Sequence, residues 1–317
     1  MSKESYRRLC LTEASIPIFS RDWWLDTVCG SDRWNVLTVE KNGSVVAALP
    51  FYMPVKGVVT MPQYTQTMGI WFAPATANTK YSSALEERQT LSKQLIDSLK
   101  AKKFMQHFDA SFTDWLPFYW NGFYQTTKYT YRLNILQNSD LLLSNMSEQA
   151  RRNIRNARDG FQISVKQGIS IDEFMTVQSQ SFERQNITDR RSADILRRLV
   201  ETTRQRGQGD LWGGYDSDGR LHAAAFVVWQ SSSAYYIAGG GDPALRKSGA
   251  HSLVMWEAIK YVSQMTDVFD FEGSMLPGVE RFFRQFGAIQ TPYSTISKGK
   301  LSLYDKLRIK LTMKRNG

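Results

Sequence analysis

Two acidic residues stand at the end of an apolar stretch late in the chain. Asp270 and Glu272 alternate with phenylalanines in the segment Phe269-Asp270-Phe271-Glu272, and residues two apart in a strand share a face. Two carboxylates at the mouth of a cleft would take a proton from an ammonium nucleophile, and their mutual repulsion would raise one pKa toward neutral pH. We therefore predict that Glu272 and Asp270 are catalytic, with ordinary surface carboxylates as the alternative.

Adjacent tyrosines, Tyr235 and Tyr236, precede a run of three glycines in another apolar stretch. Neighbouring side chains of a strand point to opposite faces, so only one of the two would enter a cleft beside the strand. A tyrosine there would protonate a leaving group or hydrogen-bond the substrate. We predict a catalytic role for Tyr236 and a substrate contact for Tyr235. The alternative is one core tyrosine and one surface tyrosine.

The loop after those glycines has the features of a phosphate-binding turn. Residues 246–252 read RKSGAHS and open a segment of helical periodicity. Free backbone N–H groups and the helix dipole attract anions to the start of a helix. An ordinary strand-to-helix turn, in which glycine supplies a positive φ, is the alternative. On the first interpretation the phosphates of a donor molecule contact Arg246, Ser248, Gly249, His251 and Ser252.

Arginines recur at helical spacing in two segments. Arg151 and Arg155 lie one turn apart beside an apolar stripe in a helix predicted at Ser147–Asp159. Arg281 and Arg284, three residues apart, would point the same way from a short helix. We predict that all four bind an anionic substrate or an oxyanion, and solvated helix faces are the alternative.

A unit that occurs twice in the chain must position these residues. Each half contains a hairpin signal, Asn42-Gly43 in the first and Asp218-Gly219 in the second, because both dipeptides favour the positive φ of tight turns. A helical segment and a short strand follow in both halves. Each copy then closes on a glycine after an aromatic pair, Gly122 and Gly287. The repeat predicts two α/β units of residues 1–144 and 145–298, with mixed, mostly antiparallel sheets flanked by helices.

The second copy has a definite predicted order of elements. Periodicity and turn residues predict helices at 147–159, 171–184, 193–206, 278–286 and from 252, a hairpin at 211–230, strands at 234–239 and 268–271, and a last hairpin to about 298.

Three segments resemble the Fem-type branch of the GNAT superfamily. The strand Tyr131-Arg132-Leu133 precedes an Arg-x-x-Ile-Arg-x-Ala-Arg helix that begins at Arg151, and an apolar-Asp-apolar-x-Gly strand end precedes a Phe-x-x-x-Phe-Gly segment. The order of predicted elements is similar to the GNAT order. The chain departs from the pattern at Phe283, where peptidyltransferases of this family often carry a lysine.

The resemblance implies two tandem GNAT-like half-domains and the activity of an N-acyltransferase. Such an enzyme would move an acetyl or aminoacyl group from acyl-CoA, or from aminoacyl-tRNA, to an amine. The acceptor would be a small metabolite or a peptidoglycan-linked or lipid-linked precursor of the cell envelope, and no metal is expected. A non-catalytic GNAT scaffold that binds a ligand or partner is the alternative.

Composition sets the outer limits of these expectations. The chain has 317 residues, of which 42% are hydrophobic and 22% charged, as in globular proteins of more than one domain. Its apolar runs are shorter than the ~20 residues of a membrane span, and its first residues carry charge where a signal peptide needs an apolar stretch. We therefore expect a cytoplasmic protein.

The net charge of +10 is concentrated in a C-terminal tail, residues 299–317. Leucines and Tyr304 alternate there with lysines at helical spacing, which is typical of a basic amphipathic helix. Such a tail would attach the protein to the anionic inner face of a membrane, and a docked terminal helix is the alternative. A general nucleic-acid-binding protein is a further alternative that has no support beyond charge. The family resemblance keeps tRNA as a possible partner, and the oligomeric state is not indicated.

Overall fold

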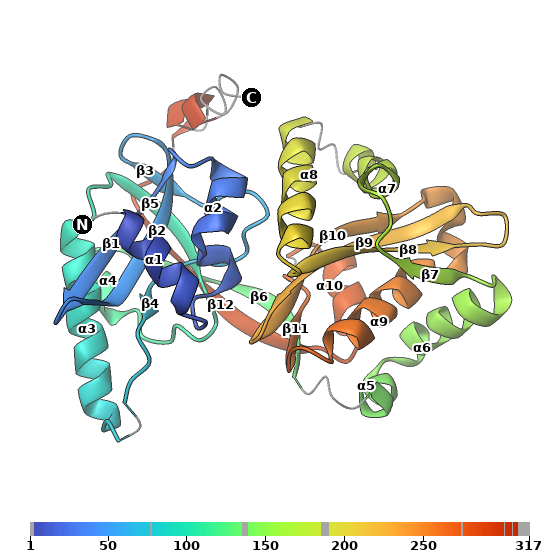
Figure 1. Ribbon diagram of the computed structural model, residues 1–317, viewed down its shortest axis with the longest axis horizontal. Coiled ribbons are helices and arrows are strands. Elements are labelled where there is room, and N and C mark those ends of the chain that lie inside the picture. The colour runs from blue at the N-terminus through green and yellow to red at the C-terminus, as the bar shows by residue number, and fades with distance from the viewer. Residues whose placement is uncertain are drawn as a thin grey trace. The chain divides into compact units, whose positions relative to one another are not determined.

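The computed structural model describes residues 3–76, 78–134, 139–184, 190–273, 275–300, 302–305 and 307–309. The chain divides into two compact units, one of residues 1–128 with 292–317 and one of residues 129–291. The second unit is thus inserted into the sequence of the first (Figure 1). The expected units were residues 1–144 and 145–298. In the structure the second unit begins at residue 129, and the last strand of the chain returns to the first unit.

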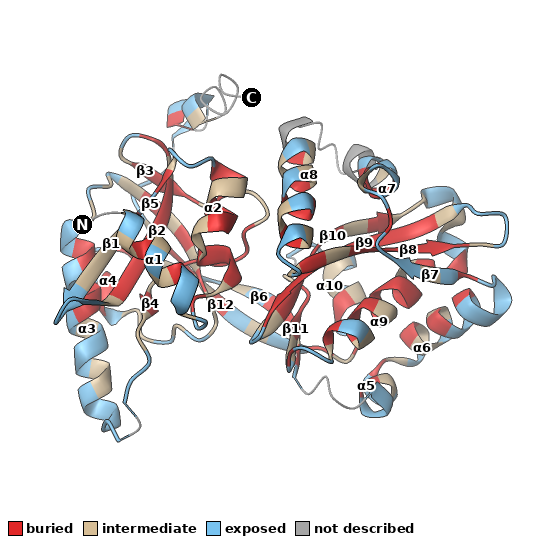
Figure 2. Ribbon diagram, viewed as in Figure 1, coloured by how far each residue is buried: buried red, intermediate tan, exposed pale blue. Residues whose placement is uncertain are grey.

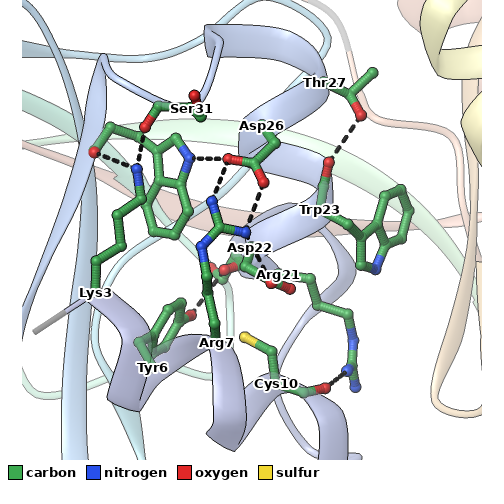
Figure 3. A network of polar contacts seen from close by, with 12 residues as sticks. Lys3, Tyr6, Arg7, Cys10, Arg21, Asp22, Trp23, Asp26, Thr27 and Ser31 are labelled. Carbon is green, nitrogen blue, oxygen red and sulfur yellow. Dashed lines mark hydrogen bonds and ion pairs between the residues drawn. The ribbon is translucent and has the colours of Figure 1, made fainter.

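The first unit begins with two helices, α1 (Lys3–Thr12) and α2 (Asp22–Cys29), joined by a short 3-10 turn at Ile18–Ser20. The side chain of Asp26 links the helices to the sheet. Its carboxylate accepts hydrogen bonds from Nη1 and Nη2 of Arg7 at 2.7 and 2.8 Å and from the indole N–H of Trp34 at 2.8 Å (Figure 3). A bidentate pair of this kind fixes the orientation of both partners.

The sheet of the first unit has the strand order β1-β2-β3-β5-β12, with β4 beside β2. Helix α3 packs on β1 and β2, and α4 packs on α3. The core between them is rich in aromatic residues, among them Phe104, Phe108 and Phe118. The elements are β1 (Trp34–Lys41), β2 (Ser44–Val55), β3 (Val58–Thr60), β4 (Trp71–Phe72), α3 (Tyr81–Ser98), β5 (Lys103–Phe108), α4 (Leu116–Trp120) and β12 (Ile289–Lys298).

The sheet of the second unit has the strand order β6-β11-β10-β9-β8-β7. Helices α7 and α8 lie on one face of these strands and α6 and α9 on the other (Figure 1). The sheet residues are accordingly buried along nearly the whole of β9 and β10 (Figure 2). The strands are β6 (Tyr124–Asn134), β7 (Ser164–Gln167), β8 (Gly209–Tyr215), β9 (Leu221–Gln230), β10 (Ser233–Gly241) and β11 (Val268–Asp270).

The helices of the second unit begin with α5 (Ser139–Asn145) and α6 (Glu148–Arg155), and the hydroxyl of Ser147 caps α6. A π-helical turn, Asn156–Gly160, and a 3-10 turn, Pro243–Ser248, connect elements of the core. The other helices are α7 (Ile171–Arg184), α8 (Arg190–Gln205), α9 (Ala250–Val262) and α10 (Pro277–Arg284). These bounds agree with the expected elements to within a few residues.

Corresponding glycines of the two copies occupy corresponding turns. Gly122 follows α4 and precedes β6, and Gly287 follows α10 and precedes β12, with φ of 76° and 78°. The two hairpin turns differ, however. Asn42 and Gly43 both have positive φ in a two-residue turn, as a type I′ turn requires. The second hairpin closes through the longer segment 216–220, where only Gly219 has positive φ.

The expected hairpin at the end of the chain is wrong. Residues 289–298 form the single strand β12, whose second half pairs antiparallel with β5. The segment contains no glycine, asparagine or aspartate, which are the residues that provide the positive φ of a tight turn. It therefore continues as one extended strand.

Candidate active site

Strands β10 and β11 part from one another after Tyr235 and Asp270. They pair in parallel only at Ala234–Phe269 and Tyr235–Asp270. Beyond this point β10 continues along β9 as far as Gly241, with a bulge between Tyr236 and Ala238. Strand β11 ends at Asp270, and Phe271 donates its N–H to the carbonyl of Tyr131 on β6. Divergence of two parallel strands leaves backbone groups at the parting point available to a ligand.

Asp270 is completely buried at this point and is held by three donors. The Nε of Arg132 lies 2.7 Å from Oδ2, the hydroxyl of Thr130 donates to Oδ1, and the backbone N–H of Glu272 donates to Oδ1 at 2.8 Å. An ion pair and two hydrogen bonds fix the orientation of this carboxylate. Asp270 is thus not exposed at a cleft mouth, and its contacts suit it to holding its neighbours in place.

Glu272 has a different environment. Its Oε1 atom is buried without a hydrogen-bond partner among the described residues, and burial, followed by the charge of Asp270, raises the pKa of its carboxyl well above the usual value. Its φ of 60° takes the chain out of the extended conformation, so the expected alternation of the two acids along a strand ends at Asp270. Strained backbone and unpaired buried polar atoms concentrate at functional sites.

A second group of polar side chains faces β6 from α10. The hydroxyl of Tyr131 donates to Oε1 of Glu280 at 2.6 Å and accepts from Nε2 of Gln290 at 2.8 Å. Glu280 also pairs with Nε of Arg284 at 3.0 Å. Burial and the hydrogen bond to Glu280 raise the pKa of Tyr131. Arg284 therefore has an acidic partner in the folded chain.

Tyr235 and Tyr236 are both buried, at 6% and 9% exposure, so the alternative of one core and one surface tyrosine is wrong. Helices cover both faces of β10, and neither side chain reaches solvent freely. The hydroxyl of Tyr236 lies 3.4 Å from Nε2 of His251. Burial raises the pKa of Tyr236, so its hydroxyl keeps its proton over the physiological range.

Phe283, at the position of the family lysine, is part of the core. Its ring lies 6.0 Å from that of Tyr236 and 5.2 Å from that of Phe271. The neighbouring Phe282 stacks on His251 at 4.8 Å. An aromatic cluster thus occupies the space that a lysine side chain would need.

The loop at residues 246–252 is closed by its own hydrogen bonds. Gly249 has φ of 75° and donates its N–H to the carbonyl of Arg246, while the N–H of Ala250 goes to the hydroxyl of Ser248 and that of Ser252 to the carbonyl of Gly249. Ser248 and Ser252 are buried, and Arg246 is exposed. These backbone donors are already used within the loop.

Helix α6 lies directly against the same loop. A Cβ atom at residue 249 would be 2.7 Å from the carbonyl oxygen of Asn153, and the side chain of Asn156 donates to the carbonyls of Lys247 and Ser248. Glycine is therefore required at residue 249 for both its φ and the close approach of α6. This geometry favours the interpretation of the loop as a strand-to-helix turn.

Comparison with known proteins agrees with this architecture. Residues 144–284 match the family model described as an acetyltransferase (GNAT) domain. The crystal structure of FemX superposes with a TM-score of 0.66 at 14% identity, over 93% of this chain and 96% of that one. The chain thus has the fold of FemX, and its residues 144–284 match a GNAT domain. By sequence, no curated protein gives a significant match.

Two further solved structures share the tandem fold. A tandem GNAT protein from the clavulanic acid biosynthesis pathway has a TM-score of 0.52 at 12% identity, over 93% of this chain and 94% of that one. The structure of L-PGS from Bacillus licheniformis has a TM-score of 0.54 at 10% identity, over 98% and 96%. At these identities the likeness shows the fold alone.

The arginines of this GNAT domain differ in their surroundings. Arg151 is partly exposed and donates to the carbonyl of Ser144 at 3.0 Å, and Arg155 is exposed on α6. Arg281 is exposed on α10. Arg155 and Arg281 form no ion pair within the described part of the chain, so both remain available to an anion.

Sequence reasoning missed the residues of β6 that contact Asp270. Thr130 and Arg132 belong to the strand on which the family resemblance was recognised, but their positions relative to β11 depend on strand pairing, with Arg132 opposite Asp270. The available signal was an arginine between Tyr131 and Leu133, since a half-buried guanidinium requires an acidic partner.

The first GNAT-like unit contains a cavity of about 570 Å³. It lies between the segment that precedes α3, the first turns of α3 and the segment that follows β5. Apolar walls are formed by Trp71, Phe72 and Phe112, and Arg88 and Asp109 supply opposite charges. No group of three or more His, Cys, Asp or Glu residues able to hold a metal ion occurs among the described residues.

Proposed function

We propose that this protein is an N-acyltransferase whose reaction centre lies where β10 and β11 part. It would transfer an acetyl or aminoacyl group from acyl-CoA or aminoacyl-tRNA to an amine of a small metabolite or a cell-envelope precursor, in the cytoplasm. The observation that carries this proposal is Glu272, a carboxyl group with a buried, unpartnered oxygen and a raised pKa at the parting point.

Each step of the reaction has a candidate residue. Glu272 accepts a proton from the acceptor ammonium, and the free amine attacks the acyl carbonyl carbon. The C–S or C–O bond of the donor then breaks, and the leaving sulfur or oxygen takes a proton from Tyr236, whose raised pKa keeps its hydroxyl protonated. Tyr236 recovers a proton from the attacking nitrogen as the amide forms. Backbone N–H groups at the parting point stabilise the oxyanion.

Other residues have positioning or binding roles in this scheme. Asp270 and Arg132 hold the backbone at Glu272, and Tyr235 lies beside them in the register of β10 and β11. Arg151, Arg155, Arg281 and Arg284 would bind anionic parts of the substrates. Orientation of the two reactants supplies much of the rate in such a site.

The loop at residues 246–252 and the comparisons bear on which acyl donor the protein uses. Acyl-CoA bound through Arg246, Ser248, Gly249, His251 and Ser252 would compete with α6 for the loop. The description of the clavulanic acid neighbour names AcCoA, which supports a CoA ester as donor. The resemblance of the sequence to Fem-type enzymes supports an envelope precursor as acceptor.

The experiment compares Glu272→Gln with the matched surface variant Glu257→Gln, which alters a carboxylate paired with Lys260 on α9. Acyl transfer is measured from CoA thioesters and from aminoacyl-tRNA to a panel of amines. We expect Glu272→Gln to lower kcat by ~10²–10⁴ and Glu257→Gln to retain full activity. Equal activity of both variants would contradict the assignment of Glu272.

A non-catalytic scaffold is the second candidate function. Phe283 fills the position of the family lysine, and the donors of the 246–252 loop are used internally. A scaffold would bind a ligand without turnover. Tight calorimetric binding of a thioester or aminoacyl-tRNA, with no acyl transfer to any amine of the panel, would establish this alternative.

A further inference from the structure

Five exposed lysines gather at one end of the first unit's sheet. The N–H groups of Lys102 and Lys103 both donate to the carbonyl of Gly57, next to Lys56, and a Cβ atom at residue 299 would lie 3.0 Å from the carbonyl of Lys102. The turn between β2 and β3, the start of β5 and the end of β12 therefore meet here. We call the exposed lysines at this place the lysine end: Lys56, Lys100, Lys102, Lys298 and Lys300.

The lysine end carries uncompensated positive charge. None of its five side chains forms an ion pair with any other part of the described chain. Lys298 donates instead to the carbonyl of Asn121 at 2.8 Å. The neighbouring Asp305 is already paired with Lys103 and accepts from Ser302, which lowers its pKa to about 2. A cluster of this kind attracts an anionic surface.

Large apolar side chains project beside these lysines. Lys298 contacts the C-cap residue of α4, and the helix exposes Tyr119 by 59% and Trp120 by 62%. On the other side, the pair of Lys103 with Asp305 anchors a helical segment that exposes Leu303 by 85% and Leu307 by 55%. Figure 2 shows this segment near the C-terminus, mostly in the exposed colour with a buried part. Isolated exposed leucines are common, but a group of them among lysines indicates a binding surface.

We infer that the lysine end, with Trp120, Tyr119, Leu303 and Leu307, docks on an anionic lipid surface. Lysines bind the headgroups as point charges, tryptophan and tyrosine favour the headgroup level, and leucines enter the acyl boundary. No helix among the described residues has the length and apolar character needed to cross a bilayer, so the attachment is peripheral. Exposed leucines contribute nothing to phosphate or base contacts, which favours lipid over nucleic acid.

The test measures sedimentation with phosphatidylcholine vesicles that contain or lack phosphatidylglycerol. The full chain should bind only the anionic vesicles and dissociate as salt is raised. Each lysine near such a surface strengthens binding by about fivefold, so Lys102→Glu with Lys300→Glu should weaken binding by at least ~25-fold. The control, Lys166→Glu with Lys247→Glu in the second unit, changes the net charge equally and should bind as the original chain does.

A second variant separates lipid from nucleic acid. Leu303→Ser with Leu307→Ser removes two exposed side chains without touching the core, and it should weaken vesicle binding while leaving the unfolding midpoint unchanged. Equal loss of vesicle binding in the lysine variant and its control would overturn the inference. It would also be overturned if the chain bound tRNA but not anionic vesicles, with the leucine variant unaffected.

Discussion

Glu272 illustrates how one side chain can combine a cost in stability with a role in chemistry. An unpaired buried polar atom costs ~1–3 kcal/mol, and the positive φ of a non-glycine residue adds strain. The ion pair of Asp270 with Arg132 and the hydrogen bond from the Glu272 N–H hold this conformation in place. The protein thus keeps a proton acceptor of raised pKa at a fixed position.

The raised pKa of Glu272 predicts a specific pH dependence of stability. The folded state binds this proton more tightly than the unfolded state, so the stabilisation is complete below the unfolded pKa of about 4.5 and is lost as pH rises through the folded pKa;. Glu272→Gln cannot lose the proton. We expect the variant to gain ~1–3 kcal/mol relative to the original chain between acidic and neutral pH.

Urea unfolding at several pH values measures this difference. Glu257→Gln, at a partly exposed and ion-paired site, is the control and should show no such gain with pH. A difference that stays constant across the range would mean that Glu272 is not held in a low-dielectric environment.

At the scale of elements, the packing of α6 on α9 depends on one glycine. Gly249 and Gly219 have nearly the same φ, 75° and 79°, but a Cβ atom would meet the backbone of Asn153 at the first and open space at the second. The two positions therefore share the conformational cost of a side chain and differ only in the steric cost.

This pair yields a matched prediction. Gly219→Ala should destabilise the fold by ~1 kcal/mol through its φ alone, and Gly249→Ala by ~1–3 kcal/mol more, as for overpacked sites. Equilibrium denaturation measures both. Equal losses of unfolding free energy in the two variants would mean that α6 can move away from residue 249 at no cost. The loop at residues 246–252 would then be accessible to a phosphate group.

The same elements show what a sequence can and cannot predict. Period-two and period-3.6 patterns placed α6, α7 and the strands β8 to β11 correctly, because their buried positions are apolar and the pattern records it. The pairing of Arg132 with Asp270 joins residues about 140 positions apart, and no local pattern records that contact. The closed loop at Gly249 was unpredictable for the same reason, since α6 arrives from a distant segment.

At the scale of the whole molecule, the first unit is built from two separate segments, residues 1–128 and 292–317. Residues 294–298 of β12 pair with residues 104–108 of β5, and Gln125 donates to Ser294. We expect residues 129–291 alone to unfold cooperatively in urea. Residues 1–128 alone should not, whereas 1–128 joined to 292–317 by a short Gly/Ser linker should regain a cooperative transition. Cooperative unfolding of 1–128 alone would show that β12 is dispensable.

The inserted arrangement also orders events during synthesis on the ribosome. The first unit cannot finish its sheet until the last residues of the chain emerge, about 160 residues after Lys128. At ~5–20 residues per second this interval is roughly 8–33 s, long enough for the inserted unit to fold first. During that time the edge of β5 has no partner and resembles other open strand edges that attract foreign chains. The nascent polypeptide should therefore be most prone to aggregation, and most dependent on chaperones, just before residues 292–298 emerge.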